Sequence, residues 1–301
     1  MIEQLLKNTT FLKDYKEIQK IDKGLSFEDK YLITTNLNEK KYFARIFALE
    51  QYEGKSNEFS ILQAMKSYTN KSIEPIEIGK FKDRGYMVTT YLEGLDAEEM
   101  LPSLPESAQY QIGVDAGKEL LKIHNFKAPE HLESWYERKR RKHQNYIHDY
   151  KLCGIKIDQD EKIMRFIDEH LHLMKDRPNL FQHDDFHPGN LIVKDGAFAG
   201  IIDFGRYDWG DPIHEFLKIG IFTRNISIPF SIGQIKGYFQ DQEPDDEFWC
   251  LYSLYLAMCI FSTVVWSLKV IPDDIETMLK NINTILEDHN YFKKMKPSWY
   301  E

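Results

Sequence analysis

The stretch from Phe248 to Leu268 contains no charged residue, and it constrains the fold more than any other feature of this sequence. By length alone it could span a bilayer, which takes about 20 apolar residues. Tyrosine, serine and threonine side chains dilute its apolarity, however, acidic residues stand on both sides, and no basic flank sets an orientation. We therefore predict a buried helix at the centre of a large helical core, and no membrane partner.

The sequence before about residue 92 differs in pattern from the sequence that follows. With 301 residues, the chain is long enough for about two domains or lobes. We predict an α+β fold, with residues 1–92 as a small mixed β-sheet lobe with one main helix, and residues 93–301 as a larger, mostly helical lobe. The predicted strands of the small lobe are 30–35, 41–47 and 86–91, and its helix is 56–65. The predicted helices of the large lobe are 107–125, 131–151, 160–175, 212–223, 231–240, 246–270 and 273–288.

The net charge and the cysteine content limit the kinds of binding partner that we expect for this chain. The chain has 39 basic and 48 acidic residues, a formal net charge of −9, which disfavours a protein that coats nucleic acid. The basic run 138–142 is the one feature that suggests nucleic acid, and a solvated helix face explains it better. The three cysteines have no metal-like spacing, and we expect them to be free in a reducing, cytoplasmic setting.

The segment 182–205 contains the most informative group of polar residues. Asp195-Gly196 lies between two β-prone runs and predicts a two-residue hairpin. Counting back along the hairpin makes Asn190 and Asp203 diagonal neighbours on one face, at roughly 7–8 Å or somewhat less between carbons. One hard cation can bridge that separation, so the pair predicts a magnesium site.

Asp185 precedes Asn190 by five residues, and the Pro188-Gly189 turn between them brings the two close together. A carboxylate in that place lies within reach of a substrate hydroxyl. The alternative explanation is a polar hairpin in which aspartates make turns and histidines cap them. Four positions at fixed spacing favour the catalytic interpretation.

The pattern His-x-Asp-x-x-x-x-Asn followed by Asp-Phe-Gly resembles the catalytic loop and metal-binding pair of the kinase fold. With His-Pro-Gly before the asparagine and Gly-Asp-Pro at 210–212, the chain is similar over most of its length to the aminoglycoside phosphotransferase family. The resemblance implies a bilobal protein-kinase-like fold. It also implies that Asp185 orients or deprotonates the acceptor hydroxyl, that His183 braces the loop, and that Asn190 and Asp203 hold the Mg²⁺ that bridges the phosphates of ATP or GTP.

The same resemblance implies nucleotide contacts in the small lobe. Arg45 takes the place of the strand lysine that contacts phosphates, and Glu58, on the helix, is its expected partner. Gly24 and Ser26 fall in the loop that covers the phosphates.

Thr90 and Leu92 lie where the resemblance puts the hinge, whose backbone would bind the nucleotide base. Gly54-Lys55-Ser56 imitates the end of a phosphate loop, but Leu49 stands in the place of the first glycine. The Walker interpretation of that run therefore fails.

Two positions depart from the family pattern. Asp184 stands where glycine is usual, which leaves two adjacent carboxylates as candidates for the base. Only Asp185 keeps four residues before Asn190, and adjacent side chains of an extended stretch point opposite ways. Glu215 stands where the family usually has aspartate, and its longer reach leaves its role open.

The acceptor follows least directly from the sequence. Asp208, Asp211 and Glu215 are candidate substrate residues, and the acidic stretch 241–247 is a candidate outer wall, which together favour a polycationic aminoglycoside. A solvated loop and helix start explains the stretch 241–247 equally well, and Asp211 is also a candidate helix cap. A macrolide, choline, a sugar or an amino-alcohol remains an alternative acceptor, and a nucleotide-binding pseudokinase is the rival without turnover. The oligomeric state does not follow from the sequence.

Overall fold

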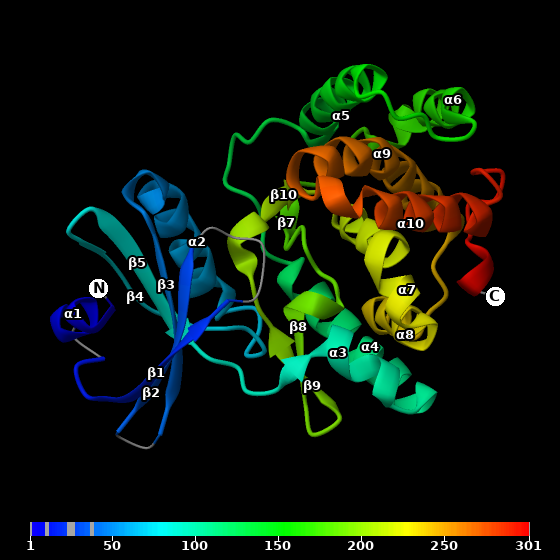
Figure 1. Ribbon diagram of the computed structural model, residues 1–301. Helices are drawn as coiled ribbons and strands as arrows, with labels where there is room; N and C mark the ends of the chain where they lie inside the picture. The colour runs from blue at the N-terminus through cyan, green and yellow to red at the C-terminus, as the bar shows by residue number, and fades with distance from the viewer. Residues whose placement is uncertain (1, 10–11, 23–27, 37–38, 301) are drawn as a thin grey trace. The chain divides into compact units, whose positions relative to one another are not determined.

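The computed structural model describes residues 2–9, 12–22, 28–36 and 39–300, and the chain folds into two compact units. The smaller unit comprises residues 1–94 together with 199–205, and the larger unit comprises the remainder (Figure 1). The sequence-based division after residue 92 assigns two stretches, 93–94 and 199–205, to the helical part instead. The second stretch includes Asp203, so this aspartate belongs to the smaller unit.

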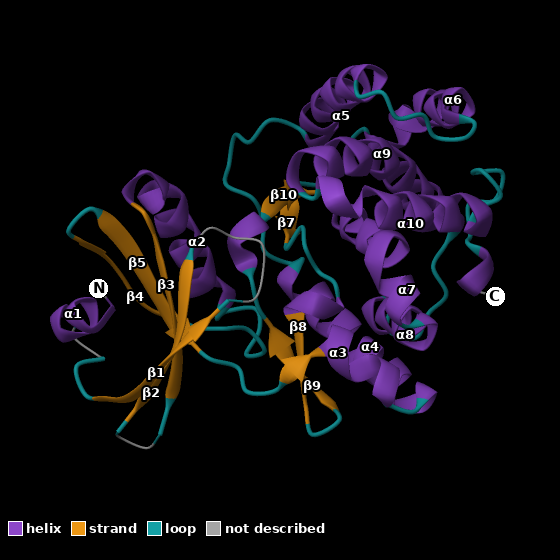
Figure 2. Ribbon diagram, in the orientation of Figure 1, coloured by secondary structure: helices purple, strands orange, loops and turns teal. Residues whose placement is uncertain are grey.

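The smaller unit is built on a five-stranded sheet in which every pair of neighbouring strands is antiparallel. Ala44 and Ile46 of β3 lie on one face of the sheet, in the core with Val88 of β5, and the side chains of Arg45 and Phe47 between and after them are buried as well. Helix α2 packs against β4 and β5 (Figure 2). It buries Leu62 and Met65. The elements of this unit, in sheet order and then helices, are β1 (Tyr15–Ile21), β2 (Asp29–Thr35), β3 (Lys41–Ala48), β5 (Arg84–Thr90), β4 (Pro75–Phe81), α1 (Ile2–Asn8) and α2 (Tyr52–Met65).

The larger unit is mostly helical, and α9 is its central helix. This helix contains the uncharged stretch noted in the sequence, and it begins where the side chain of Asp245 accepts a hydrogen bond from the backbone N–H of Phe248, at 2.8 Å. It is long and apolar enough to cross a membrane, but 83% of its apolar segment is buried, and α5, α6 and α10 pack against it. The helices are α3 (Ala97–Met100), α4 (Glu106–Ile123), α5 (Trp135–Leu152), α6 (Asp160–His170), α7 (Arg224–Ile226), α8 (Ile228–Tyr238), α9 (Asp246–Val270) and α10 (Ile275–Asp288).

Helices α4 and α8 meet through glycines. A Cβ atom on Gly117 of α4 would lie 2.0 Å from a backbone oxygen of α8, and one on Gly237 of α8 would lie 2.0 Å from a backbone oxygen of α4. Gly113 and Gly233 meet the partner backbone in the same way, at 2.2 Å. The two backbones are therefore in direct contact, which only residues without a side chain allow.

Two short ladders position the catalytic loop, residues 183–190. Strand β7 (Leu180–Gln182) leads into this loop, and β10 (Asp208–Gly210) leads into the helical segment from residue 211. The two strands pair antiparallel, with Gln182 opposite Asp208 and Gly210 opposite Leu180, so the two segments leave from opposite ends of this short ladder. The side-chain amide of Gln182 donates a hydrogen bond to the backbone carbonyl of Asp211 and so links the ladder to the second segment. After the loop, β8 (Leu191–Lys194) pairs with β6 (Leu95–Asp96) and turns into β9 (Ala197–Ile201). The turn residues Asp195 and Gly196 have φ values of 52° and 75°, as the predicted two-residue hairpin requires.

Candidate active site

The carboxylate of Asp185 is held on both oxygens within the larger unit. Its Oδ1 accepts a hydrogen bond from Lys218 Nζ at 2.9 Å, and its Oδ2 accepts one from the side-chain amide of Asn190 at 3.2 Å. The same amide donates to the backbone oxygen of Asp185 at 2.9 Å. A ring nitrogen of His187 lies 3.7 Å from Oδ1, and a guanidinium nitrogen of Arg206 lies 3.8 Å from Oδ2.

These donors determine the charge of Asp185. Burial alone would raise its pKa, but the neighbouring ring of His187 and the positive charge of Lys218 hold the pKa well below the ordinary value. Asp185 is therefore an anion near neutral pH. An anion with fixed oxygens is suited to accept a hydrogen bond from a hydroxyl and to orient it.

The neighbouring Asp184 has different partners. Its φ of 58° lies in the left-handed region, which glycine adopts most readily and which aspartate tolerates better than most residues. This conformation accounts for an aspartate at a place where the resemblance leads us to expect glycine. One Asp184 oxygen lies 3.7 Å from Nδ1 of His214, and burial raises the pKa of this carboxyl.

Glu215 is completely buried and holds the backbone on both sides of Asp185. Its Oε2 accepts the backbone N–H of Asp184 at 3.1 Å, and its Oε1 accepts that of Phe186 at 3.3 Å. Burial would raise the pKa of Glu215, but His124 and these contacts lower it below the ordinary value. The longer side chain noted in the sequence is thus used to brace the catalytic loop.

His183 was predicted to brace the same loop. Its ring is buried and lies edge-on to the ring of Phe186, with 6.0 Å between ring centroids. Its electrostatic interaction with Glu215 is among the causes that lower the pKa of that carboxyl.

The other two candidate substrate carboxylates have cationic partners inside the larger unit. Asp211 is fully buried, receives two hydrogen bonds from Arg177 at 2.8 and 3.0 Å, and caps the following turn by accepting the backbone N–H of Ile213. Asp208 accepts a hydrogen bond from Arg138 at 3.0 Å. Structural contacts therefore account for both carboxylates without a substrate.

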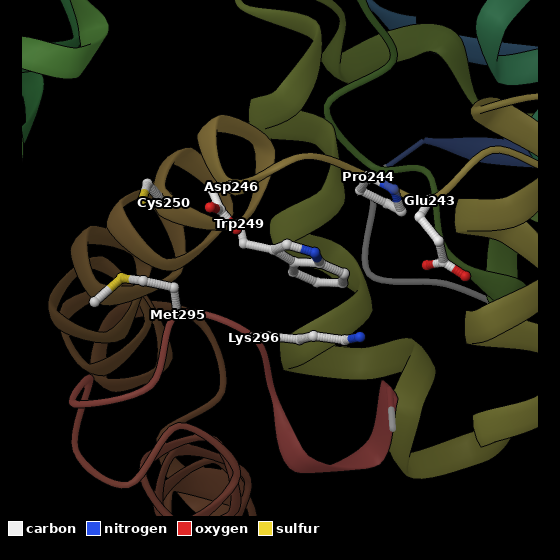
Figure 3. A pocket seen from close by; sticks show the side chains of 7 residues that line it. All are labelled: Glu243, Pro244, Asp246, Trp249, Cys250, Met295 and Lys296. Carbon is white, nitrogen blue, oxygen red and sulfur yellow. The ribbon is translucent and has the colours of Figure 1, made fainter.

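Two of the five carboxylates in the acidic stretch 241–247 form ion pairs within the larger unit. Glu243 forms an ion pair with Lys236, and Glu247 forms one with Arg177 at 2.9 Å. A hollow of about 460 Å³ lies beside this stretch, and Lys296 covers the rings of Trp249 and Tyr300 there, at 5.9 and 5.0 Å (Figure 3). Its lining residues are Glu243, Pro244, Asp246, Trp249, Cys250, Met295 and Lys296.

The basic run 138–142 lies on α5, and the predicted solvated face describes only part of it. Arg141 is exposed and pairs with Glu133. Lys139 points inward, with its Nζ 2.6 Å from Nε2 of His214, and burial lowers the pKa of Lys139 to about 8. The run is split in this way because successive helical residues face different sides of the helix.

In the smaller unit, a buried ion network surrounds Arg45. Arg45 forms a close ion pair with Glu58, and both side chains are almost fully buried. Lys55 lies 3.1 Å from Glu58 and 2.5 Å from Glu28, whose second oxygen lies 3.8 Å from Arg45. Burial would lower the pKa of Arg45, but the carboxylates of Glu58, Glu28 and Asp203 raise it. Sequence reasoning missed Glu28 and Lys55.

Of the four further residues predicted to contact the nucleotide base and phosphates, the structure describes Thr90 and Leu92. Thr90 ends β5, and its backbone N–H already donates to the carbonyl of Glu74 at 2.9 Å. Leu92 follows the strand and is half-buried. Gly24 and Ser26 lie outside the described residues.

The two predicted metal ligands fit a hard cation by their chemistry. The amide nitrogen of Asn190 is used on Asp185, which leaves its amide oxygen as a ligand. Asp203 is exposed in the smaller unit, and its Oδ1 accepts a long hydrogen bond of 3.4 Å from the backbone N–H of Gly205. Among the described residues, no group of three histidine, cysteine, aspartate or glutamate side chains gathers to hold a metal. Phosphate oxygens would have to complete the shell.

Together, the antiparallel sheet unit with its Arg45–Glu58 pair and the helical unit with its aspartate–asparagine loop define a protein-kinase-like fold. Comparisons with known proteins then identify the family of the chain. A family model described as the phosphotransferase enzyme family matches residues 17–252, so the chain belongs to that family. No curated protein matches the chain.

Solved structures of aminoglycoside phosphotransferases have the same fold. A thermostable mutant of APH(4)-Ia superimposes with a TM-score of 0.66 at 15% identity, covering 94% of this chain and 98% of that chain. The gentamicin complex of APH(2")-IIa gives 0.67 at 17% identity, covering 96% of both chains. ADP-bound APH(2'')-Ib gives 0.61 at 16% identity, covering 99% and 98%. At such identities the likeness concerns the fold.

Proposed function

We propose that this protein transfers the γ-phosphate of ATP or GTP to a hydroxyl group of a small molecule, with Mg²⁺ as cofactor. The observation that carries the proposal is the carboxylate of Asp185, ionised and held on both oxygens by Lys218 and Asn190. Membership of a phosphotransferase family supports the same reaction class. The intact catalytic loop argues against a pseudokinase.

The chain's own residues position the reactants. Asp185 accepts a hydrogen bond from the acceptor hydroxyl and directs its oxygen toward the phosphate. Glu215 holds the backbone on both sides of Asp185 and so fixes the position from which this carboxylate projects. Arg45, kept in place by Glu58, contributes a permanent positive charge for phosphate oxygens.

Asn190 and Asp203 would hold the metal, the first through its amide oxygen and the second through its carboxylate. When bound, Mg²⁺ supplies positive charge against the nucleotide phosphates as they become more negative. Gly24 and Ser26 would cover the phosphates, and the chain from Thr90 to Leu92 would bind the base.

For the acceptor, we propose an aminoglycoside, which would make the protein an antibiotic-resistance enzyme. Structures of the neighbours include complexes with gentamicin and with hygromycin B, and this supports the class. The support from acidic side chains is weaker than the sequence suggested, because Asp208, Asp211 and Glu215 all have partners in the fold. A macrolide, choline, a sugar or an amino-alcohol is the competing acceptor. We place the enzyme in the cytoplasm, which the three free cysteines support.

The test is phosphate incorporation from ATP or GTP into kanamycin, gentamicin, streptomycin, hygromycin, erythromycin and choline, side by side. Mg²⁺-dependent transfer to one or more aminoglycosides is the expected result. Transfer only to erythromycin or choline would show that the acceptor is not an aminoglycoside. The absence of both phosphate transfer and nucleotide hydrolysis would contradict the proposed function.

The metal assignment has its own test in thermal melting. Nucleotide should raise the Tm in the presence of Mg²⁺, and Asp203→Ala or Asn190→Ala should reduce that increase. An increase that is independent of Mg²⁺ and unaffected by Asp203→Ala would contradict the assignment.

A further inference from the structure

We infer that Lys218 is a positioning residue for phosphotransfer, acting through the carboxylate of Asp185. No motif singles out this lysine, which lies 33 residues beyond the aspartate in the chain. The inference rests on the proposed function, because it assumes that Asp185 orients an acceptor hydroxyl.

The contact is direct and shielded from water. Lys218 Nζ lies 2.9 Å from Oδ1 of Asp185, and each side chain exposes only 14% of its surface. Buried opposite charges at this distance interact far more strongly than an exposed pair. Burial would lower the pKa of Lys218, but the carboxylates of Asp185 and Asp184 raise it, so the lysine stays charged.

An irregular helical segment places Lys218 there. A 3-10 turn covers Pro212–Phe216, a π-helical turn covers Ile219–Thr223, and Lys218 lies between them. The carbonyl of Lys218 accepts a hydrogen bond from the hydroxyl of Thr223 at 3.3 Å. Such changes of helical winding are frequent at functional sites, because they redirect a side chain that a regular helix would place elsewhere.

The other side chains near Asp185 do not duplicate this contact. Arg206 is 3.8 Å away and half-exposed, and His187 is 3.7 Å away. Asn190 holds the other oxygen, Oδ2. Without Lys218, Oδ1 has no partner at hydrogen-bond distance among the described residues, and the carboxylate is free to rotate.

The experiment compares Lys218→Met and Lys218→Arg with the wild-type enzyme, using ATP or GTP and whichever acceptor the panel identifies. Lys218→Met should lower kcat on the order of 100-fold, the cost expected for misplacing a catalytic group. The nucleotide KM should change little, and Lys218→Arg should recover part of the lost kcat. Lys236→Met is the matched control, since Lys236 lies on α8, is similarly buried and pairs with the carboxylate of Glu243, and the kcat of this variant should match the wild type.

The outcomes separate the inference from the proposed function. If the wild type shows no turnover, both are overturned. If the wild type turns over and Lys218→Met, folded by thermal melting, keeps its kcat, only the inference is overturned. If Lys218→Met does not fold, Lys218→Arg decides. A kcat reduced at unchanged nucleotide KM supports positioning, because the guanidinium changes the geometry and keeps the charge, and an unchanged kcat overturns it.

Discussion

The smaller and the larger unit each bury a set of charges, but they balance them differently. Around Arg45, two cations meet two carboxylates, with Asp203 as a further negative charge. Around Asp185, a single carboxylate is surrounded by an ammonium, a guanidinium, an imidazole and an amide. Under the proposed function, the first arrangement would keep cations in place for an anionic ligand, and the second would keep one anion fixed for a neutral hydroxyl. The comparison predicts that removing a charge near Arg45 weakens nucleotide binding, whereas removing the charge of Asp185 lowers kcat.

The largest effect is expected where the single anion is removed. Asp185→Asn should lower kcat by about 10³-fold or more, because the acceptor loses its anionic hydrogen-bond partner, while nucleotide binding survives. Asp184→Asn should lower kcat far less, since the carboxylate of Asp184 faces His214. Steady-state kinetics check both variants, and an active Asp185→Asn beside an inactive Asp184→Asn would reverse the assignment.

In the smaller unit, removing one member of the network should weaken nucleotide binding. Arg45→Met should raise the nucleotide KM about tenfold or more and should destabilise the fold by roughly 3–5 kcal/mol, because it leaves Glu58 buried without its closest partner. The double variant Arg45→Met/Glu58→Gln should recover part of the stability and none of the nucleotide affinity. Denaturant unfolding together with nucleotide titration distinguishes the two effects, and full recovery of affinity in the double variant would contradict a phosphate role for Arg45.

Glu215 is an intermediate case, because it holds the backbone of the catalytic loop and does not contact the carboxylate of Asp185. Glu215→Gln keeps the shape but replaces one acceptor oxygen with a donor that faces a backbone N–H. We expect a loss of about 1–3 kcal/mol in stability and a lower kcat at nearly unchanged nucleotide KM. A variant with raised acceptor KM and normal kcat would instead support the substrate role suggested by the sequence.

The smallest effect on turnover is expected for Lys139. Its pKa is about 8 in the folded chain, below the ordinary value of 10.5, so the unfolded chain holds an extra proton between these values. The free energy of unfolding should therefore rise with pH from about 8 to 10.5. Urea unfolding of wild type and Lys139→Met across this window isolates the contribution, and identical pH dependence in both would show that the pKa of Lys139 is not lowered.

Sequence reasoning succeeded where spacing is local. The uncharged stretch predicted α9 as a buried helix, and Asp195-Gly196 predicted the hairpin turn. The fixed spacing of Asp185 and Asn190 located two side chains that do contact each other.

Contacts between distant segments could not be predicted in the same way. Lys218 is one lysine in a helical stretch, and nothing local distinguishes it from a surface residue. The run that contains Lys55 fails as a Walker loop and suggests no other role, yet α2 places Lys55 2.5 Å from Glu28, which precedes β2 in the chain. Lys139 was grouped with its charged neighbours, and only the rotation of α5 separates it from them.

The glycine contact between α4 and α8 has a mechanical consequence. Each helix inserts its backbone into the space that a side chain of the other would occupy, at four positions along their length. Sliding by one residue would drive side chains into backbone, so the two helices share one fixed register. We therefore expect α4 and α8 to move together, as one rigid pair, in any rearrangement of the larger unit.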